Sequence, residues 1–157
     1  MTEAEFEIYM ARMVPDYARE HVSAGSLSEE NALRLAEEQV RELLPEGVAT
    51  KGQYISSVWH EAESEAVGVL WFERQERGAE VTAFVYDIEI FEPFRRRGYA
   101  SQAFRLLEDR ARELKISTIS LHVFGHNHGA RKMYTGLGYE ETHVMMSKSL
   151  GTEEGRT

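Results

Sequence analysis

The stretch YDIEIFEPFRRRGYASQAFRLLEDRA, residues Tyr86–Ala111, carries the strongest fold signal in this chain. It begins as an apolar strand pattern, passes through three consecutive arginines and Gly98, and ends as a helical pattern. A glycine turn that joins a strand to a helix presents unpaired backbone N–H groups at the positive end of the helix dipole. Such a turn binds phosphate groups, and neighbouring arginines add charged, fork-shaped donors. The stretch therefore predicts a site for a diphosphate-bearing ligand; a solvated basic turn is the alternative interpretation.

The rest of the chain is acidic, in contrast to this basic turn. The chain has 157 residues, no cysteine and a formal net charge of -9. Residues 93–132 carry a charge of +6, which leaves -15 for the remainder. We therefore expect a small anion to bind and no nucleic acid to bind, because most of the surface would repel a polyanion. Without cysteine the chain has no disulfide, thiolate metal site or cysteine nucleophile.

Length and continuity predict one domain over residues 1–150, followed by a flexible tail over residues 151–157. No apolar run approaches the length of a membrane span, and the first residues lack a signal-peptide pattern. The expected localisation is cytoplasmic, with no membrane partner.

The hydrophobic spacing and the turn signals predict the order of helices and strands. A capping box at Thr2 and Glu5 predicts a helix that ends near Pro15, with a short second helix over residues 15–22. Ser28 is the expected cap of the next helix, which Pro45 ends. Strands are predicted over residues 53–59, 66–73, 80–91, 116–124 and 139–147, a hairpin turn over 74–78, and helices over 100–114 and 127–137. This order predicts an α/β (α+β) fold with a mixed, mostly antiparallel sheet flanked by helices.

Two motifs in this order resemble the GNAT superfamily of N-acetyltransferases. Arg-x-x-Gly-x-Ala, at Arg95, Gly98 and Ala100, resembles the acyl-CoA loop after the fourth strand of that superfamily. HNHGARKMYTGLGYE, residues 126–140, is similar to its Asn-x-x-Ala-x-x-x-Tyr-x-x-x-Gly-Tyr element, with Asn127 and Tyr134 at the matching positions. The resemblance covers residues 66–150 and is especially close to small uncharacterised bacterial members. Because Thr2 already caps a helix, the superfamily's first strand is expected to be missing or supplied otherwise.

The resemblance implies an enzyme that moves an acetyl group from acetyl-CoA, its cosubstrate, to a primary amine by direct attack in a ternary complex. Tyr134 is the implied general acid toward the thiolate, and Asn127 caps its helix and contacts the pantetheine. The backbone of Ile88 and Ile90 is expected to pair with the pantetheine arm. The pyrophosphate is expected on the arginine turn, which consists of Arg95, Arg96, Arg97, Gly98, Tyr99, Ala100 and Ser101.

Other roles stay open at this point. Glu89 interrupts the apolar strand and is a candidate general base, or else a solvated or substrate-recognising carboxylate. The acidic first helices, including Asp16, Tyr17, Glu20 and His21, suit a cationic acceptor, which is a small-molecule or peptide amine. No metal is expected, because the histidines have no carboxylate or cysteine at ligand spacing. A homodimer is one option, and a non-catalytic acyl-CoA-binding or sensing module is the alternative function.

Overall fold

The structure is a computed structural model that describes residues 1–148 and Leu150. The described residues divide into two units, Met1–Phe124 and a second that begins at Gly125. The prediction of one domain over residues 1–150 stays a prediction, and the expected tail over residues 151–157 lies outside the described residues. No helix in the described part of the chain is long and apolar enough to cross a lipid bilayer.

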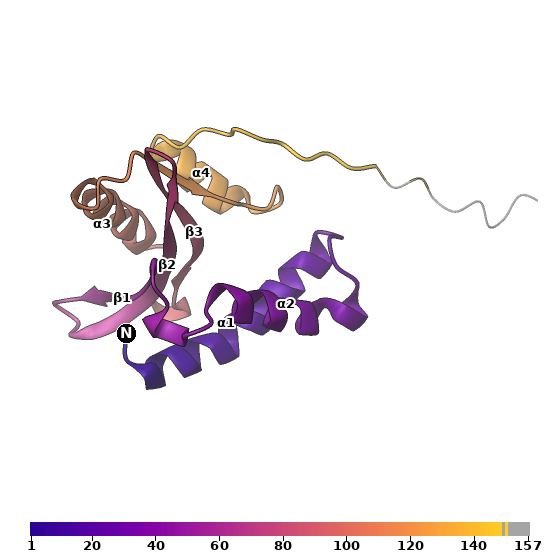
Figure 1. Cartoon of the computed structure of the whole chain (residues 1–157), viewed down its shortest axis with the longest axis horizontal. Coiled ribbons are helices and arrows are strands. Elements are labelled where there is room, and N and C mark those ends of the chain that lie inside the picture. Colours follow the sequence, from indigo (N-terminus) through magenta and orange to yellow (C-terminus); the bar gives the residue numbers. More distant parts are fainter. Residues whose placement is uncertain (149, 151–157) are drawn as a thin grey trace, which may run out of the picture. The chain divides into compact units, whose positions relative to one another are not determined.

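The first unit is built around a four-stranded sheet of order β1-β2-β3-β4 (Figure 1). The strands are β1 (Gln53–His60), β2 (Glu65–Arg77), β3 (Glu80–Ile90) and β4 (Thr118–Leu121). The first two pairings are antiparallel and the pairing of β3 with β4 is parallel. This confirms the mixed, mostly antiparallel sheet. The predicted hairpin turn over residues 74–78 is too early, because β2 continues to Arg77 and the turn falls at Gly78 and Ala79.

Helices cover both faces of this sheet. Helices α1 (Glu3–Ser23) and α2 (Glu29–Leu43) lie together on one side of the β2–β3 hairpin, and α3 (Tyr99–Glu113) lies on the other (Figure 1). Six successive residues of β2, Val67–Phe72, are buried, as expected for a strand that has helices on both faces. On the α1 side, the core joins Tyr9 and Met13 to Ile55, Val69 and Trp71. The predicted flanking helices are thereby confirmed.

Helix α1 differs from the prediction, because it continues through Pro15 as one helix of 21 residues. A proline inside a helix removes one backbone hydrogen bond and usually breaks or kinks it. Here the buried residues Tyr9, Met13, Val14 and Ala18 form one stripe on both sides of Pro15. Packing of this stripe against the sheet stabilises the helix beyond the local break, since tertiary contacts supply most helical stability in proteins.

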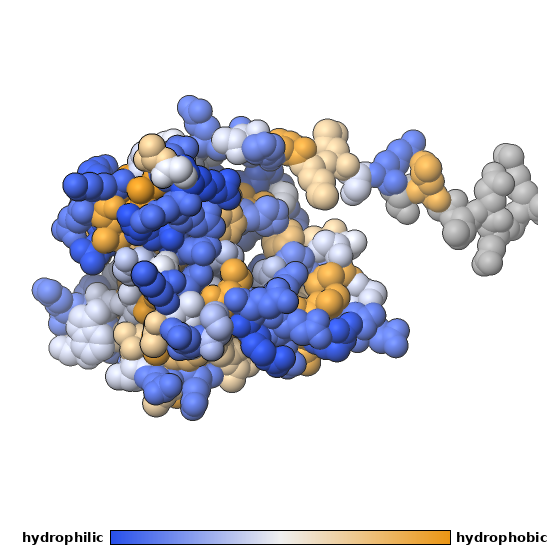
Figure 2. All heavy atoms as spheres, in the orientation of Figure 1, coloured by the Kyte–Doolittle hydropathy of each residue, from blue (hydrophilic) through white to orange (hydrophobic). Residues whose placement is uncertain are grey.

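Both helix starts predicted near the N-terminus are confirmed. The Thr2 hydroxyl accepts a hydrogen bond from Glu5 N, and the Glu5 carboxylate accepts one from Thr2 N at 2.7 Å, which completes the capping box. Ser28 is the N-cap of α2. On the face drawn in Figure 2, hydrophilic residues predominate, as expected where the polar faces of such helices are exposed.

The second unit contains helix α4 (His128–Gly136), close to the helix predicted over residues 127–137. The prediction of a strand over residues 139–147 is wrong, because the described residues of this segment form neither helix nor strand. A strand exists only where a partner strand takes up its hydrogen bonds, and an apolar pattern by itself supplies no partner. Val144, Met145 and Met146 of this segment are exposed.

Two local features shape the second half of β3. The register between β2 and β3 shifts between Trp71 and Phe72, so Tyr86 is an extra residue, as in a β-bulge. Near the end of the strand, β2 approaches unusually closely: a Cβ added to Gly68 would lie 2.2 Å from the carbonyl oxygen of Glu89. Only glycine permits this approach, which holds Glu89 and Ile90 tightly against β2.

Candidate functional site

The arginine turn begins where β3 ends. Glu92–Phe94 form a short 3₁₀ turn, with Pro93 at its start, and the chain then passes through Arg95, Arg96 and Arg97 to Gly98. Gly98 has φ +82°, in the left-handed region that favours glycine, and is the N-cap of α3. The first hydrogen bond of the helix runs from Gln102 N to Gly98 O at 3.1 Å. The amides of Tyr99, Ala100 and Ser101 therefore lie in the first turn, where N–H groups have no partner within the helix.

The surface around this turn is open and basic. A Cβ added to Gly98 would meet nothing nearer than Gln102 Nε2 at 4.0 Å, and the three arginines are exposed. Arg95 Nε donates to the carbonyl oxygen of Ile90 at 2.9 Å, which links the turn to the end of β3. The Arg97 guanidinium lies 5.8 Å from the centre of the Phe94 ring. The predicted phosphate-binding residues are thus adjacent, and the helix N-terminus and guanidinium groups suit a diphosphate.

The strand before the turn extends beyond its pairing with β4, and among the described residues the carbonyl oxygen of Ile90 there accepts a hydrogen bond from Arg95. Strands β3 and β4 pair only from Thr82–Val85 to Thr118–Leu121. The amide of Phe91 donates to Val67 O of β2 at 2.9 Å. Because backbone groups alternate in direction along a strand, the N–H and C=O groups of Ile88 and Ile90 point away from β2. These are the residues for which pairing with an extended ligand is predicted.

Two side chains of α1 bind the carboxylates of β3. Tyr9 Oη donates to Asp87 Oδ2 at 2.6 Å, and Arg12 Nη2 and Nε donate to Glu89 Oε2 at 2.8 and 3.2 Å. Burial raises the pKa of Asp87 to about 6, and Glu89 and Glu20 contribute in the same direction. Burial and the Asp87 charge raise the pKa of Tyr9. Glu89 is thus fixed by a guanidinium group, whereas Asp87 is held by a neutral hydroxyl.

The predicted acceptor wall on α1 is partly an aromatic cluster. The rings of Tyr17 and His21 lie 4.3 Å apart, and those of His21 and Phe124 lie 5.3 Å apart. Burial, together with the nearby His122, lowers the pKa of His21. Tyr17 Oη donates to Gln39 at 3.1 Å. Asp16, by contrast, forms an ion pair with Arg19 on the helix surface.

Asn127 and Tyr134 belong to the second unit. Asn127 Oδ1 accepts a hydrogen bond from Ala130 N at 3.1 Å, so the predicted cap is confirmed. Tyr134 is half-buried on α4, and its ring lies 6.0 Å from that of Tyr139. Arg131 of the same helix donates to Gly125 O at 3.2 Å and pairs with Glu141. These contacts fix the helix on which the candidate acid is placed.

Several residues near Glu89 were not singled out from the sequence. Tyr9 and Arg12 lie in the first helix, and their hydrogen-bond partners lie 78 and 77 residues away. Tyr86 donates to Glu73 Oε2 at 2.9 Å, and its place on this face follows from the bulge. No local pattern indicates these pairings. Within the described residues, no group of three or more histidine, aspartate or glutamate side chains is arranged to hold a metal ion.

Comparison with known proteins identifies the family of this chain. The model of the Acetyltransferase (GNAT) family matches residues 12–139. YycN of Bacillus subtilis (strain 168), described as an uncharacterized N-acetyltransferase, is 39% identical over 150 residues, which are 96% of each chain. YdgE of the same organism, described in the same words, is 32% identical over 96% of this chain and 95% of its own.

The crystal structure of YycN has a TM-score of 0.91 to this chain at 38% identity, and the match covers 97% of this chain and 96% of YycN. The family match spans most of the sequence, and it includes both the arginine turn and the helix that carries Tyr134. The chain therefore belongs to the GNAT family of acetyltransferases.

Proposed function

We propose that this protein transfers an acetyl group from acetyl-CoA to a primary amine, with both substrates bound together. The observation that carries the proposal is the arginine turn. Gly98, at φ +82°, directly precedes the first amides of α3 and follows three exposed arginines. Backbone amides at a helix N-terminus bind phosphate without a side chain, and arginines neutralise the remaining charge. The diphosphate of coenzyme A is the group that this turn would hold.

The acyl donor supplies a thioester carbonyl. The amine nitrogen attacks the carbonyl carbon, an amide C–N bond forms and the C–S bond breaks. The nitrogen gives up a proton, and the thiolate takes one up. We assign to the Tyr134 hydroxyl the proton that the thiolate takes up. We expect the backbone N–H of Ile90, which points away from β2, to stabilise the developing oxyanion. Asn127 holds the start of the helix that carries Tyr134.

A carboxylate on the α1 side of β3 would take the proton from the amine, directly or through water. Glu89 is the assigned group, and Arg12 fixes the position of its carboxylate by two hydrogen bonds to one oxygen. The other carboxylate oxygen of Glu89 would then face the proton that is removed. A base of this kind acts within hydrogen-bond reach of the amine or through one water.

A turnover assay tests the proposal. Purified protein is mixed with acetyl-CoA and a panel of amines, and release of free thiol is followed. We expect amine-dependent thiol release that falls at least about 100-fold in Tyr134→Phe, since a positioned proton donor contributes roughly 10² to 10⁴. Tight binding of coenzyme A without turnover on any amine would contradict the proposal and favour an acyl-CoA-binding module.

A further inference from the structure

Asp87 and Glu89 form a pair of carboxylates on the α1 side of β3. Both residues lie beyond the bulge and pair with β2 in regular register, at Trp71 and Val69. Because alternate residues of a strand share a face, the two side chains point the same way from α carbons about 7 Å apart. Glu89 directly precedes Ile90, whose N–H is assigned to the oxyanion. The carboxylate pair therefore lies beside the position at which the amine would react.

Helix α1 holds each carboxylate of the pair by one oxygen. Tyr9 Oη donates to Asp87 Oδ2 at 2.6 Å, and Arg12 donates twice to Glu89 Oε2, at 2.8 and 3.2 Å. The second oxygen of each carboxylate accepts no side-chain hydrogen bond from the described residues. Each of these oxygens has lone pairs that accept a proton or a hydrogen bond. One water molecule between them would connect Glu89 to Asp87.

The two carboxylates differ in how their charge is compensated. Glu89 forms an ion pair with Arg12, whereas Asp87 accepts a hydrogen bond from the neutral Tyr9 hydroxyl. Burial raises the pKa of Asp87 to about 6; the hydrogen bond from Tyr9 opposes this shift, and the charges of Glu89 and Glu20 add to it. Pairing with a guanidinium group favours the ionised form of a carboxylate. A proton taken up by the pair would therefore rest on Asp87.

We propose that Asp87 receives the proton that Glu89 removes from the amine. This inference rests on the proposed acetyl transfer and adds to it a positioning residue that acts through Glu89. The N–H bond of the amine breaks as the proton moves to Glu89 Oε1, and Glu89 passes the proton through one water to Asp87 Oδ1. Asp87 releases the proton to solvent after the amide has formed, which returns Asp87 to its ionised form. Tyr9 keeps the Asp87 carboxylate in place during these steps.

Carboxyl NMR measures the coupling of the pair without any substrate. Full-length protein labelled with ¹³C at its carboxyl groups is titrated, and Asp87→Asn assigns the Asp87 signal. We expect a midpoint at about pH 6 for Asp87. Glu89→Gln should lower this midpoint by at least about 0.5 pH unit, because a neighbouring negative charge is lost. Tyr9→Phe should raise it by a similar amount, since a hydrogen bond to the ionised form is lost.

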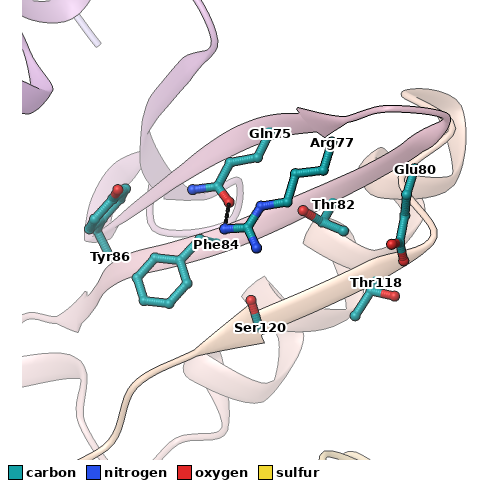
Figure 3. Close-up of a pocket in the computed structure, with 8 residues that line it drawn as sticks. All are labelled: Gln75, Arg77, Glu80, Thr82, Phe84, Tyr86, Thr118 and Ser120. Atoms are coloured by element: carbon teal, nitrogen blue, oxygen red, sulfur yellow. Dashed lines mark hydrogen bonds between the residues drawn. The ribbon is translucent and has the colours of Figure 1, made fainter.

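Tyr86 and Glu73 supply the matched control, because they form a second pair of tyrosine and carboxylate on the same sheet. Tyr86 Oη donates to Glu73 Oε2 at 2.9 Å. Figure 3 shows Tyr86 at one end of a groove of about 480 Å³, whose other lining residues lie toward the β2–β3 turn. Along β2, Glu73 is roughly 13 Å from Val69, the partner of Glu89. Glu73→Gln should therefore leave the Asp87 midpoint unchanged.

Turnover measures whether the transfer uses this proton acceptor. Thiol release from acetyl-CoA is followed with n-butylamine, spermidine and glycylglycine as amines. We expect kcat of Asp87→Asn to be lower than that of wild type by at least about tenfold at pH 8, since base catalysis contributes roughly 10² to 10⁴. The ratio of the two kcat values should approach one at about pH 5, because the wild-type Asp87 is then protonated as well. Glu73→Gln should keep the wild-type profile.

The outcomes separate the inference from the proposed function. Coupled titration of the pair without turnover of any of the three amines would support the pair and contradict the proposed function. Turnover that Asp87→Asn leaves unchanged, or lowers by the same factor at every pH, would support the proposed function and overturn the inference. An Asp87 midpoint that Glu89→Gln does not move, or that Glu73→Gln moves equally, would also overturn it.

Discussion

Gly98 is the residue on which the ligand-binding geometry of the arginine turn depends most. Its φ of +82° is costly for any residue with a Cβ, although no neighbouring atom would obstruct one. We expect Gly98→Ala to lower the free energy of unfolding by about 1 kcal/mol. It should also weaken acetyl-CoA binding at least about fivefold, because the first amides of α3 would be reoriented. Calorimetric titration measures the affinity, and urea denaturation measures the stability.

Gly78 supplies the matched control for this substitution. It lies in the β2–β3 hairpin at φ +64°, and an added Cβ would also meet no atom within 4 Å. Gly78→Ala should therefore cost a similar free energy of unfolding and leave acetyl-CoA affinity unchanged. Equal loss of affinity in both variants would mean that the effect of Gly98→Ala is a general loss of stability.

Asp87 predicts a pH dependence of stability. Its pKa is raised to about 6 in the folded protein, whereas an unfolded carboxyl group titrates near 3.9. Between these values the folded state holds the proton and the unfolded state does not, so the free energy of unfolding falls as pH rises from about 4 to 6. Asp87→Asn keeps an acceptor for Tyr9 and removes this titration.

The variant should therefore match wild type near pH 4 and exceed its stability at pH 7 by on the order of 2 kcal/mol. Urea denaturation at both pH values measures the difference. If Asp87→Asn were less stable than wild type at pH 7, the ionised carboxylate would stabilise the folded state. The predicted fall in the free energy of unfolding as pH rises would then be wrong.

At the scale of elements, α1 and β3 are joined by the pair of Arg12 and Glu89. Their side chains are 39% and 22% exposed, which limits screening by water. A double-mutant cycle with Arg12→Gln and Glu89→Gln should give a coupling of roughly 0.5–1.5 kcal/mol in urea denaturation. The pair of Arg34 and Glu38 within α2, at 60% and 46% exposure, should give only about 0.3–0.5 kcal/mol. A coupling in the first cycle no larger than in the second would show that the link between the elements adds no stability.

Sequence patterns predicted most elements because their signals are local. The capping box at Thr2, the cap at Ser28 and the alternation along β3 each depend on residues a few positions apart. The continuation of α1 through Pro15 depends instead on packing against the sheet, and the expected last strand failed for want of a partner within the described residues. The same distinction applies to the site. The arginine turn is contiguous in sequence and could be predicted, whereas the partners of Asp87 and Glu89 lie on another helix.

For the whole molecule, uneven charge is the property that bears on ligand binding. Residues 93–132 carry +6 in a chain of net charge -9, so an anionic ligand meets local attraction within a repelling field. Salt screens exposed charges, with a Debye length near 10 Å at 0.1 M and about 3 Å at 1 M. We expect the dissociation constant of acetyl-CoA to rise about three- to tenfold between 50 and 500 mM KCl, measured by calorimetric titration.

Removal of two charges from the turn tests the origin of this salt effect. Arg96→Gln combined with Arg97→Gln should weaken binding at low salt and flatten the salt dependence, because fewer charges remain to be screened. Arg105→Gln on α3 removes charge outside the turn and should keep the slope. A double variant with the full wild-type slope would show that the attraction arises elsewhere on the surface.

The short pairing of β3 with β4 also affects how fast backbone amides exchange their protons with solvent. Residues 82–85 share their hydrogen bonds with a neighbour on each side, whereas the amide of Ile90 points away from β2 and beyond the last pair with β4. Its proton should exchange with deuterium faster than those of residues 82–85. A thioester ligand that lies along this edge would slow the exchange. The amide of Ile90 would thus report occupancy by the acyl donor before any acceptor has been identified.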